Sequence, residues 1–231
     1  MDKQICKVRL AADPYPPYQY EEKGEVRGID QEIIAAAFEV HAIATETLLS
    51  PWTDCLARLE QGKADGVFQI LRAPDREQLF LFSDRLRTEQ TLLLRMSGRP
   101  GEPGGKDGRD LFPGQRLGVV RGYDYGPAID RLQGAGQVEC KGQKELIEAL
   151  AGGLVDLILM DTGVAAYLSR ELGIRGAEPL PGFEIRRSLH VAFRRDCAEI
   201  VELFNSGLAA VRKEGVYGRI LDSYGLHGED T

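Results

Sequence analysis

Aromatic and acidic side chains gather in one short segment that follows a strand-like run. The apolar run is residues 6–11, and the segment after it, residues 13–18, reads DPYPPY. Its three prolines restrict the backbone, while Asp13, Tyr15 and Tyr18 offer a carboxylate and two aromatic faces with polar tips. Ligands of open α/β sheets bind at the carboxyl ends of strands, so these three residues are predicted to contact a ligand. The alternative is a rigid turn whose tyrosines cover the core.

Trp52 is the only tryptophan of the chain, and it follows a second strand-like run, residues 46–49. That position again places a large aromatic side chain at a strand end, where a ligand could bind. Trp52 also begins an i, i+3, i+4, i+7 pattern with Cys55, Leu56 and Leu59, which is typical of the buried face of a helix. Both a ligand-binding role and a core role are therefore open.

Two arginines follow the apolar run at residues 66–71. A guanidinium beyond a strand end can hold a carboxylate through two parallel, charge-assisted hydrogen bonds, which makes Arg72 and Arg76 candidates for anion recognition. The alternative for Arg76 is a surface ion pair with Asp75 or Glu77, which would contribute little.

A glycine-flanked segment, residues 122–126, follows the run at residues 116–120 and contains Tyr123, Asp124 and Tyr125. A strand, a glycine turn and a helix start present free backbone N–H groups to an anion. The glycine spacing does not match a dinucleotide-binding fingerprint. Asp161 follows the run at residues 155–160 and could bind a cation, or it could simply cap the next helix.

These groups would be positioned by alternating strands and helices. Further strand-like runs cover residues 91–95 and 189–194. Helical patterns cover residues 30–38, 52–59, 146–150 and 200–211, and Asp30 is a possible cap of the first. Repeated strand–helix–strand order predicts βαβ units and a largely parallel sheet. Glycine- and proline-rich segments at residues 97–105 and 178–182 interrupt the pattern. We therefore expect two lobes, residues 1–96 with 188–231 and an inserted lobe of residues 97–187, with a cleft between them.

Composition excludes several classes of protein. The chain has 231 residues, and 29 Lys and Arg against 36 Asp and Glu give a net charge of −7. This acidic balance argues against nucleic-acid binding and against an anionic membrane surface as partner. No apolar run approaches the roughly 20 residues of a membrane helix. The four cysteines are widely spaced and are expected to be small buried thiols, although a Cys140–Cys197 bridge is conceivable; no Cys/His cluster suggests a metal site.

The order of these motifs resembles the type II periplasmic solute-binding proteins, in particular bacterial extracellular solute-binding protein family 3. The resemblance runs over nearly the whole chain. It rests on residues 15–18, 28–32, 62–66, 74–76, 82–83, 117–120, 155–158, 161, 204–205, 214–217 and 223–225. It implies a two-lobed α/β fold in which each lobe is a mostly parallel sheet flanked by helices, with two crossover strands between the lobes.

The resemblance also implies roles for three residues. The arginine that matches Arg76 holds the α-carboxylate of a bound amino acid in that family, and the aspartate that matches Asp161 holds its ammonium group. An aromatic residue that matches Tyr15 covers the side chain of the ligand. These implied roles agree with those expected from the strand-end positions of the three residues.

The chain departs from the family pattern at two places. Gln69 and the two apolar residues after it stand where relatives have small hydroxyl residues, and Tyr123 with Asp124 stands where a threonine or serine often meets the carboxylate. An additional carboxylate and several aromatic side chains around the ligand would favour a cationic or aromatic ligand, such as an amine or an arginine-like compound.

The expected function is capture of a small amino-acid-like or amine ligand outside the cytoplasm for ABC-type uptake. The candidate ligand-binding residues are Asp13, Tyr15, Tyr18, Trp52, Gln69, Arg72, Arg76, Tyr123, Asp124, Tyr125 and Asp161. No catalytic residue, metal or cofactor is expected. The resemblance implies a periplasmic monomer that docks on a membrane permease, with a signal peptide that this sequence does not include.

Two other functions use the same fold. A sensor domain of a receptor kinase or cyclase would need a membrane helix after residue 231, and the last residues show no start of one. A dehydratase-like enzyme would need a carboxylate with a raised pKa, for which Asp124 is the obvious candidate.

Overall fold

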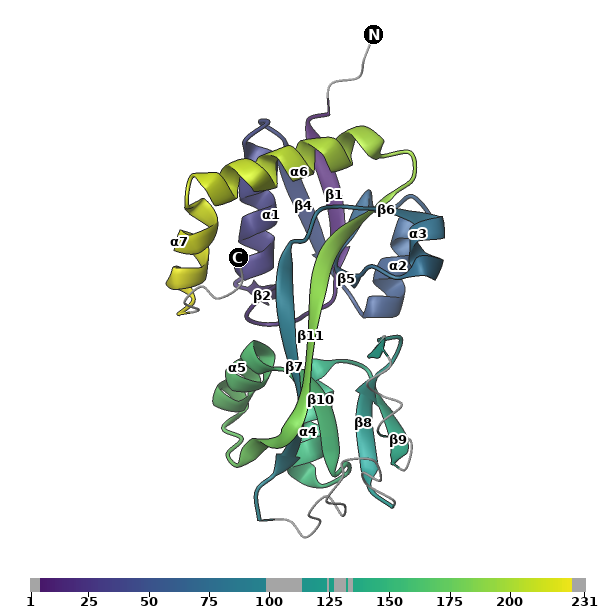
Figure 1. Cartoon of the computed structure of the whole chain (residues 1–231), viewed down its shortest axis with the longest axis vertical. Helices are drawn as coiled ribbons and strands as arrows, with labels where there is room; N and C mark the ends of the chain where they lie inside the picture. Colours follow the sequence, from purple (N-terminus) through teal and green to yellow (C-terminus); the bar gives the residue numbers. More distant parts are fainter. Residues whose placement is uncertain (1–4, 99–113, 124, 127–131, 133–134, 226–231) are drawn as a thin grey trace. The chain divides into compact units, whose positions relative to one another are not determined.

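The computed structural model describes residues 5–98, 114–123, 125–126, 132 and 135–225. The chain divides into two compact units, Met1–Thr88 with Arg187–Thr231 (unit 1) and Glu89–Arg186 (unit 2). The chain enters unit 2 along β7 (Arg87–Met96) and leaves it along β11 (Ala177–Arg194) (Figure 1). The sequence-based boundaries at residues 96 and 187 fall at the end of β7 and within β11. In the described residues, no helix is long and apolar enough to cross a membrane.

Unit 1 is built on three parallel strands. β1 (Lys7–Ala12) lies between β4 (Ala44–Leu49) and β5 (Gly66–Leu71), with Ala12 opposite Leu49 and Ala11 opposite Val67. The end of β11 pairs antiparallel with β5 and with β6 (Phe80–Phe82). β2 (Tyr20–Glu22) and β3 (Glu25–Arg27) form a separate antiparallel pair. This order places the carboxyl ends of β4, β1 and β5 at one edge of the sheet.

Helices α1 (Ile29–Glu39), α2 (Trp52–Glu60), α3 (Pro74–Leu79), α6 (Ala198–Lys213) and α7 (Val216–Ser223) complete unit 1. α6 lies across α1 (Figure 1). The rings of Phe38, Phe193 and Phe204 pack at centroid distances of 5.3–6.5 Å. A Cβ atom on Gly207 of α6 would lie 1.9 Å from the carbonyl oxygen of Ala37, so only glycine permits this approach of the two helices.

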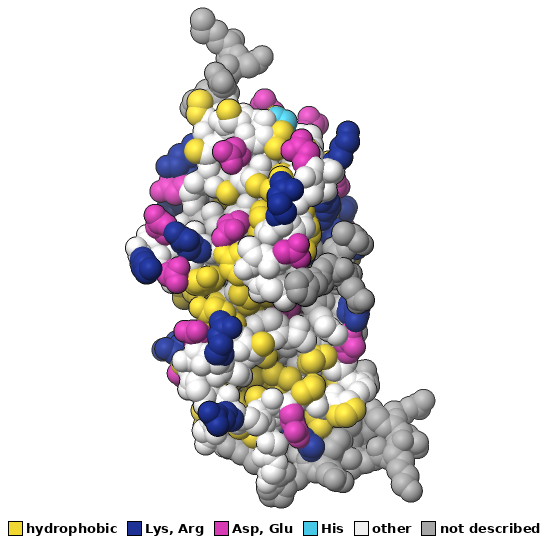
Figure 2. Space-filling model, turned by 90° about the vertical axis from the view of Figure 1, so that its left-hand side faces the viewer, with side chains coloured by type: hydrophobic (Ala, Val, Ile, Leu, Met, Phe, Trp, Pro, Cys, Tyr) yellow, Lys and Arg dark blue, Asp and Glu magenta, His cyan; other side chains and the backbone are white. Residues whose placement is uncertain are grey.

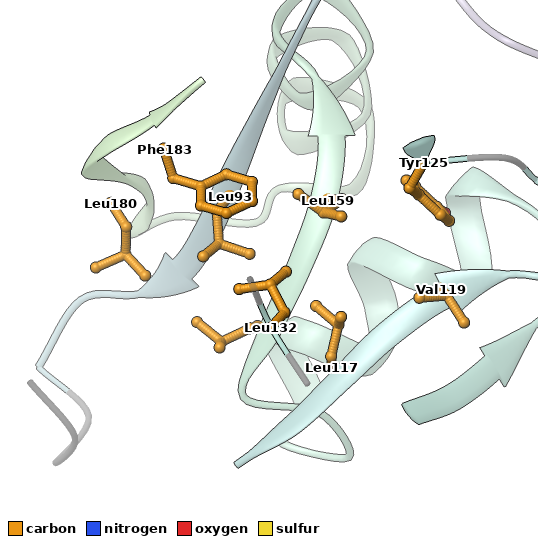
Figure 3. Packing of buried hydrophobic residues seen from close by; sticks show 9 residues of the cluster. Leu93, Leu117, Val119, Tyr125, Leu132, Leu159, Leu180 and Phe183 are labelled. Atoms are coloured by element: carbon orange, nitrogen blue, oxygen red, sulfur yellow. The ribbon is translucent and has the colours of Figure 1, made fainter. Parts of the chain in front are cut away.

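Unit 2 repeats the parallel arrangement. β8 (Arg116–Val120) pairs in parallel with β9 (Gly136–Cys140) and with β10 (Leu157–Asp161), and β7 lies antiparallel to β10. The helices of unit 2 are α4 (Gln143–Gly152) and α5 (Thr162–Leu172). Side chains from β7, β8, β10 and β11 point toward one another in its core (Figure 3). The cluster contains Leu93, Leu117, Val119, Tyr125, Leu132, Leu157, Leu159, Leu180 and Phe183.

The fold class expected from the sequence is confirmed, and the runs at residues 66–71 and 116–120 coincide with β5 and β8. Two possibilities that the sequence left open are not realised. Asp30 does not cap α1, because the N-cap position is Gly28 and Asp30 lies buried in the first turn. The conceivable Cys140–Cys197 bridge is not formed, since all four cysteines are free.

Charged side chains of both signs are interspersed on the face shown in Figure 2, with apolar side chains exposed between them. Exposed ion pairs also occur at the surface; Arg121 and Glu139, for example, lie 2.8 Å apart with more than half of each side chain exposed. Such pairs contribute little to stability individually.

Candidate functional site

The carboxyl ends of β4, β1 and β5 bring three sequence-predicted segments to one edge of the unit 1 sheet. Asp13 follows β1, Trp52 begins the helix after β4, and Gln69 lies near the end of β5. Asp13 and Gln69 each lie two residues beyond the pairing of Ala11 with Val67. This is the edge at which parallel α/β sheets bind ligands.

The segment from Tyr15 to Gln19, here called the tyrosine loop, is a closed loop that contacts the N-terminus of α1. Tyr15 N–H donates to the carbonyl of Gln19 at 2.8 Å, and Tyr18 N–H donates to the carbonyl of Tyr15 at 2.8 Å. The carbonyl oxygens of Pro17 and Tyr18 accept hydrogen bonds from the first N–H groups of α1, which no intrahelical acceptor could satisfy. The loop therefore caps the helix with its backbone.

Gly28 allows this close seating. Its φ is +122°, and a Cβ atom on it would lie 2.4 Å from the carbonyl oxygen of Tyr18. A side chain at residue 28 would thus displace the tyrosine loop from α1.

A buried ion pair holds the same loop from the other side. Arg87 Nε lies 2.9 Å from both carboxylate oxygens of Asp30, and the two side chains are 3% and 0% exposed. The guanidinium of Arg87 also lies 3.5 Å from the ring centroid of Tyr18, which is a cation–π contact in a desolvated setting. Burial, with the charge of Asp30, raises the pKa of nearby Tyr217, whose hydroxyl donates to the carbonyl of Leu86 at 3.1 Å.

Arg87 was not predicted from the sequence, because nothing in its local sequence distinguishes it from the exposed Arg85 two residues earlier. Its partner lies 57 residues away along the chain. The one available signal was Asp30, which is an acidic residue within an apolar helical pattern. Tyr15 and Tyr18, held by this support, have ring centroids 5.9 Å apart and are both buried.

The structure also links Asp13, Gln19 and Gln69, of which Gln19 was not predicted. Gln19 Nε2 donates to the backbone carbonyl of Asp13 at 3.1 Å and to Oε1 of Gln69 at 2.8 Å. Gln69 has a φ of +62°, and the pairing of β5 with β11 shifts at this point, from Ile70 opposite His190 to Phe68 opposite Val191. Gln69 is therefore the extra residue of a β-bulge.

The two predicted arginines lie on or next to α3. Arg72 donates through Nε to Glu77, and both side chains are largely exposed. Arg76 Nη1 donates to the carbonyl of Leu71, the last residue of β5, at 3.2 Å. Arg76 is thus tied to the strand end, whereas Arg72 forms a surface ion pair. A role of either residue in holding a carboxylate stays a prediction.

Trp52 is 6% exposed and lies on the buried face of α2 with Cys55 and Leu59. This is the placement that the core interpretation expects, while Leu56 is only half-buried. Burial raises the pKa of the Cys55 thiol to about 11, so this thiol is not a nucleophile at neutral pH.

In unit 2, Tyr123 and Tyr125 follow the carboxyl end of β8, and Asp161 is the last residue of β10. The hydroxyl of Tyr125 accepts the backbone N–H of Val120 at 2.8 Å, and Tyr123 packs against the apolar cluster with its ring centroid 6.1 Å from that of Tyr125. Asp124 lies outside the described residues. Asp161 is 1% exposed and caps α5, with Oδ1 accepting from Gly163 N–H at 2.8 Å and Val164 N–H at 3.1 Å.

The cap interpretation of Asp161 is therefore confirmed, and its interaction with a ligand ammonium group stays a prediction. Among the described residues, no group of three or more His, Cys, Asp and Glu side chains is placed to hold a metal ion.

Comparison with known proteins identifies the class to which this fold and these strand-end residues correspond. The model of the family "Bacterial extracellular solute-binding proteins, family 3" matches residues 8–227. The chain is 25% identical to the lysine/arginine/ornithine-binding periplasmic protein of Escherichia coli over 94% of this chain and 86% of that protein. The chain belongs to solute-binding protein family 3 and is a binding protein rather than an enzyme.

Two solved structures have a similar fold. The arginine-, lysine-, histidine-binding protein ArtJ from Geobacillus stearothermophilus has a TM-score of 0.82 at 22% identity, covering 96% of this chain and 97% of that chain. A histidine kinase sensor domain with similarity to periplasmic binding proteins also has a TM-score of 0.82 at 22% identity, covering 95% of each chain.

Proposed function

We propose that this protein captures a small amino acid or amine in the periplasm and delivers it to the membrane permease of an ABC transporter. The observation that carries the proposal is the family match over residues 8–227, which spans both units. An amino acid as the ligand is supported by the similarity to the lysine/arginine/ornithine-binding periplasmic protein of Escherichia coli.

The strand-end side chains supply the chemistry that such a ligand needs. Arg76, held against the end of β5, would bind the α-carboxylate through charge-assisted hydrogen bonds. Asp161 would bind the ammonium group, and Tyr15 would cover the side chain of the ligand. The tyrosine loop is held rigidly by α1 and Arg87, and a site that is formed before binding loses less conformational freedom on binding.

The proposal is tested by calorimetric titration of the purified protein with the common amino acids, with ornithine and with simple amines. Binding of at least one amino acid with a free α-carboxylate and α-ammonium group is expected. Esterified and N-acetylated forms of the same compound should bind much more weakly, because each removes one charge. If none of these compounds binds, the proposed function is wrong.

A sensory role is the second candidate, favoured by the similarity to the histidine kinase sensor domain. A sensor domain would bind the same class of ligand but would transmit the signal to an attached kinase. The two candidates are distinguished by reconstitution, since an uptake protein stimulates ligand transport and ATP hydrolysis when it is added to a permease of the same genome. The sensory role is favoured instead if binding is tight and no permease responds.

A further inference from the structure

Two buried polar atoms beside the tyrosine loop have no hydrogen-bond partner among the described residues. They are Oε1 of Gln19 and Nε2 of Gln69. Gln19 is fully buried. A buried donor or acceptor without a partner costs free energy, and native proteins keep few of them. The pair lies at the edge of the sheet where the proposed function places a ligand.

The orientation of both amides follows from their neighbours. The carbonyl of Asp13 can only accept, so the Gln19 atom that faces it at 3.1 Å must be the NH₂ group. That same NH₂ group faces the second glutamine at 2.8 Å, so the Gln69 atom there must be the carbonyl oxygen. Gln69 therefore keeps an N–H donor unused, and Gln19 keeps an acceptor unused. The two unused atoms belong to amides that are hydrogen-bonded to each other.

The backbone at Gln69 is built to hold this arrangement. Its φ of +62° is unfavourable for a residue with a side chain, and it occurs at a β-bulge inside a strand. The other described non-glycine residues with positive φ, Lys23 and Ala42, lie in turns. Backbone strain of this kind persists where the structure imposes it, often at binding sites.

We propose that the Gln19–Gln69 pair recognises the side chain of the bound amino acid, and that this side chain is neutral and carries an acceptor next to a donor. The inference rests on the proposed function. A carboxamide or a neutral imidazole satisfies both unused atoms at once. A guanidinium or an ammonium group offers donors only and would leave the Gln69 donor facing another donor; a carboxylate would leave the Gln19 acceptor unsatisfied.

The test compares affinities for glutamine, histidine, glutamate, arginine and lysine by calorimetry at pH 8, where free imidazole is neutral. The wild-type protein should bind glutamine or histidine most tightly. Comparison of the glutamine and histidine titrations shows whether the pair recognises a carboxamide or an imidazole. Gln69→Gly removes the amide and suits the positive φ, so this variant should fold. It should lose about tenfold or more in affinity for the preferred ligand.

Gln69→Glu is the complementary variant, because a carboxylate oxygen, which only accepts, replaces the amide nitrogen of Gln69, which donates. This variant should shift its preference toward lysine or arginine. Ala42→Gly is the matched control, since it also relieves a positive φ, and it should leave every affinity unchanged.

Each result decides between the possibilities. If amino acids bind but Gln69→Gly leaves their relative affinities unchanged, the amide pair holds a buried water only and the inference is overturned. It is equally overturned if wild-type protein prefers arginine, lysine or glutamate. If no amino acid binds to the wild type, the proposed function fails as well, and the inference fails with it.

Discussion

Arg9 and Arg116 make the same set of hydrogen bonds in the two units. Arg9 donates from its backbone N–H and Nε to Oδ2 of Asp65 at 2.9 and 3.1 Å, and from Nη2 to Oδ1 at 2.7 Å. Arg116 donates in the same pattern to Asp156 at 2.9, 3.0 and 2.8 Å. In both units Nη2 also reaches a glycine carbonyl just before the aspartate. Each unit therefore ties its first parallel strand to the loop that enters a neighbouring strand.

Asp65→Asn should make unfolding less sensitive to acid. Burial raises the pKa of Asp65, but the hydrogen bonds and charge of Arg9 lower it more, and the net pKa lies below the usual value. A carboxylate with a depressed folded-state pKa stabilises the protein above its unfolded pKa near 4, and this contribution is lost as the pH falls through the folded pKa. Urea unfolding at pH 7 and pH 3 should show a smaller decrease for Asp65→Asn than for the wild type.

The exposed Glu148→Gln variant serves as the control for this measurement and should lose as much stability in acid as the wild type. An equal acid sensitivity of Asp65→Asn and wild type would contradict the prediction.

Breaking the buried Asp30–Arg87 pair should destabilise the protein strongly. Asp30→Asn leaves a buried guanidinium without its counter-charge, which typically costs about 3–5 kcal/mol. Replacing both partners, as in Asp30→Asn with Arg87→Met, removes the uncompensated charge, so the double variant should be more stable than the sum of the two single effects predicts. Urea denaturation of the four proteins gives this comparison. Strictly additive effects would show that the pair is not coupled.

The sequence predicted those elements whose residues carry a strong local pattern. The run at residues 66–71 is almost wholly apolar and reads as a buried strand, and the structure places β5 there. The long strand β11 was only partly predicted because its first residues include prolines, a glycine and exposed charges. The tyrosine loop was singled out correctly as a strand-end feature, since its position depends only on the preceding strand.

Long-range relationships could not be predicted in the same way. The pairing of Asp30 with Arg87 and of Gln19 with Gln69 joins residues 57 and 50 positions apart, and nothing in the local sequence around one partner identifies the other. The positive φ of Gln69 is also invisible in the sequence, because a bulge arises from the register of β5 against β11. Tertiary contacts, rather than local propensity, decide these features.

Native protein should react with iodoacetamide at Cys6 alone. Cys6 is exposed, whereas Cys55, Cys140 and Cys197 are buried. Burial also raises the pKa of Cys55 and of Cys197 to about 11, which suppresses their thiolate forms. Intact-mass spectrometry should find one label on the native chain at pH 8 and four after denaturation in urea. Labelling of Cys55 at the rate of Cys6 would show that α2 opens readily.

Arg76→Ala should weaken binding of the preferred amino acid by about thirtyfold or more. Losing a partner for a buried carboxylate costs about 2–5 kcal/mol, because the anion is left without its counter-charge. Calorimetry measures the change, and Arg27→Ala, which removes an exposed arginine paired with Glu25, is the matched control. The assignment of Arg76 is wrong if the affinity of Arg76→Ala for that ligand equals that of the wild type.

Trp52 should report ligand binding through its fluorescence. It is the only tryptophan of the chain, so its emission is free of other indoles. Trp52 begins α2 directly after the end of β4, at the edge of the sheet that also carries Asp13 and Gln69. A ligand at that edge should change the environment of the indole and shift or quench its emission, and the titration midpoint should equal the calorimetric dissociation constant. Tyr15→Phe, which keeps the ring, should preserve the signal. If saturating ligand leaves the emission unchanged, Trp52 is solely a core residue with Cys55 and Leu59, and its predicted role in ligand binding is wrong.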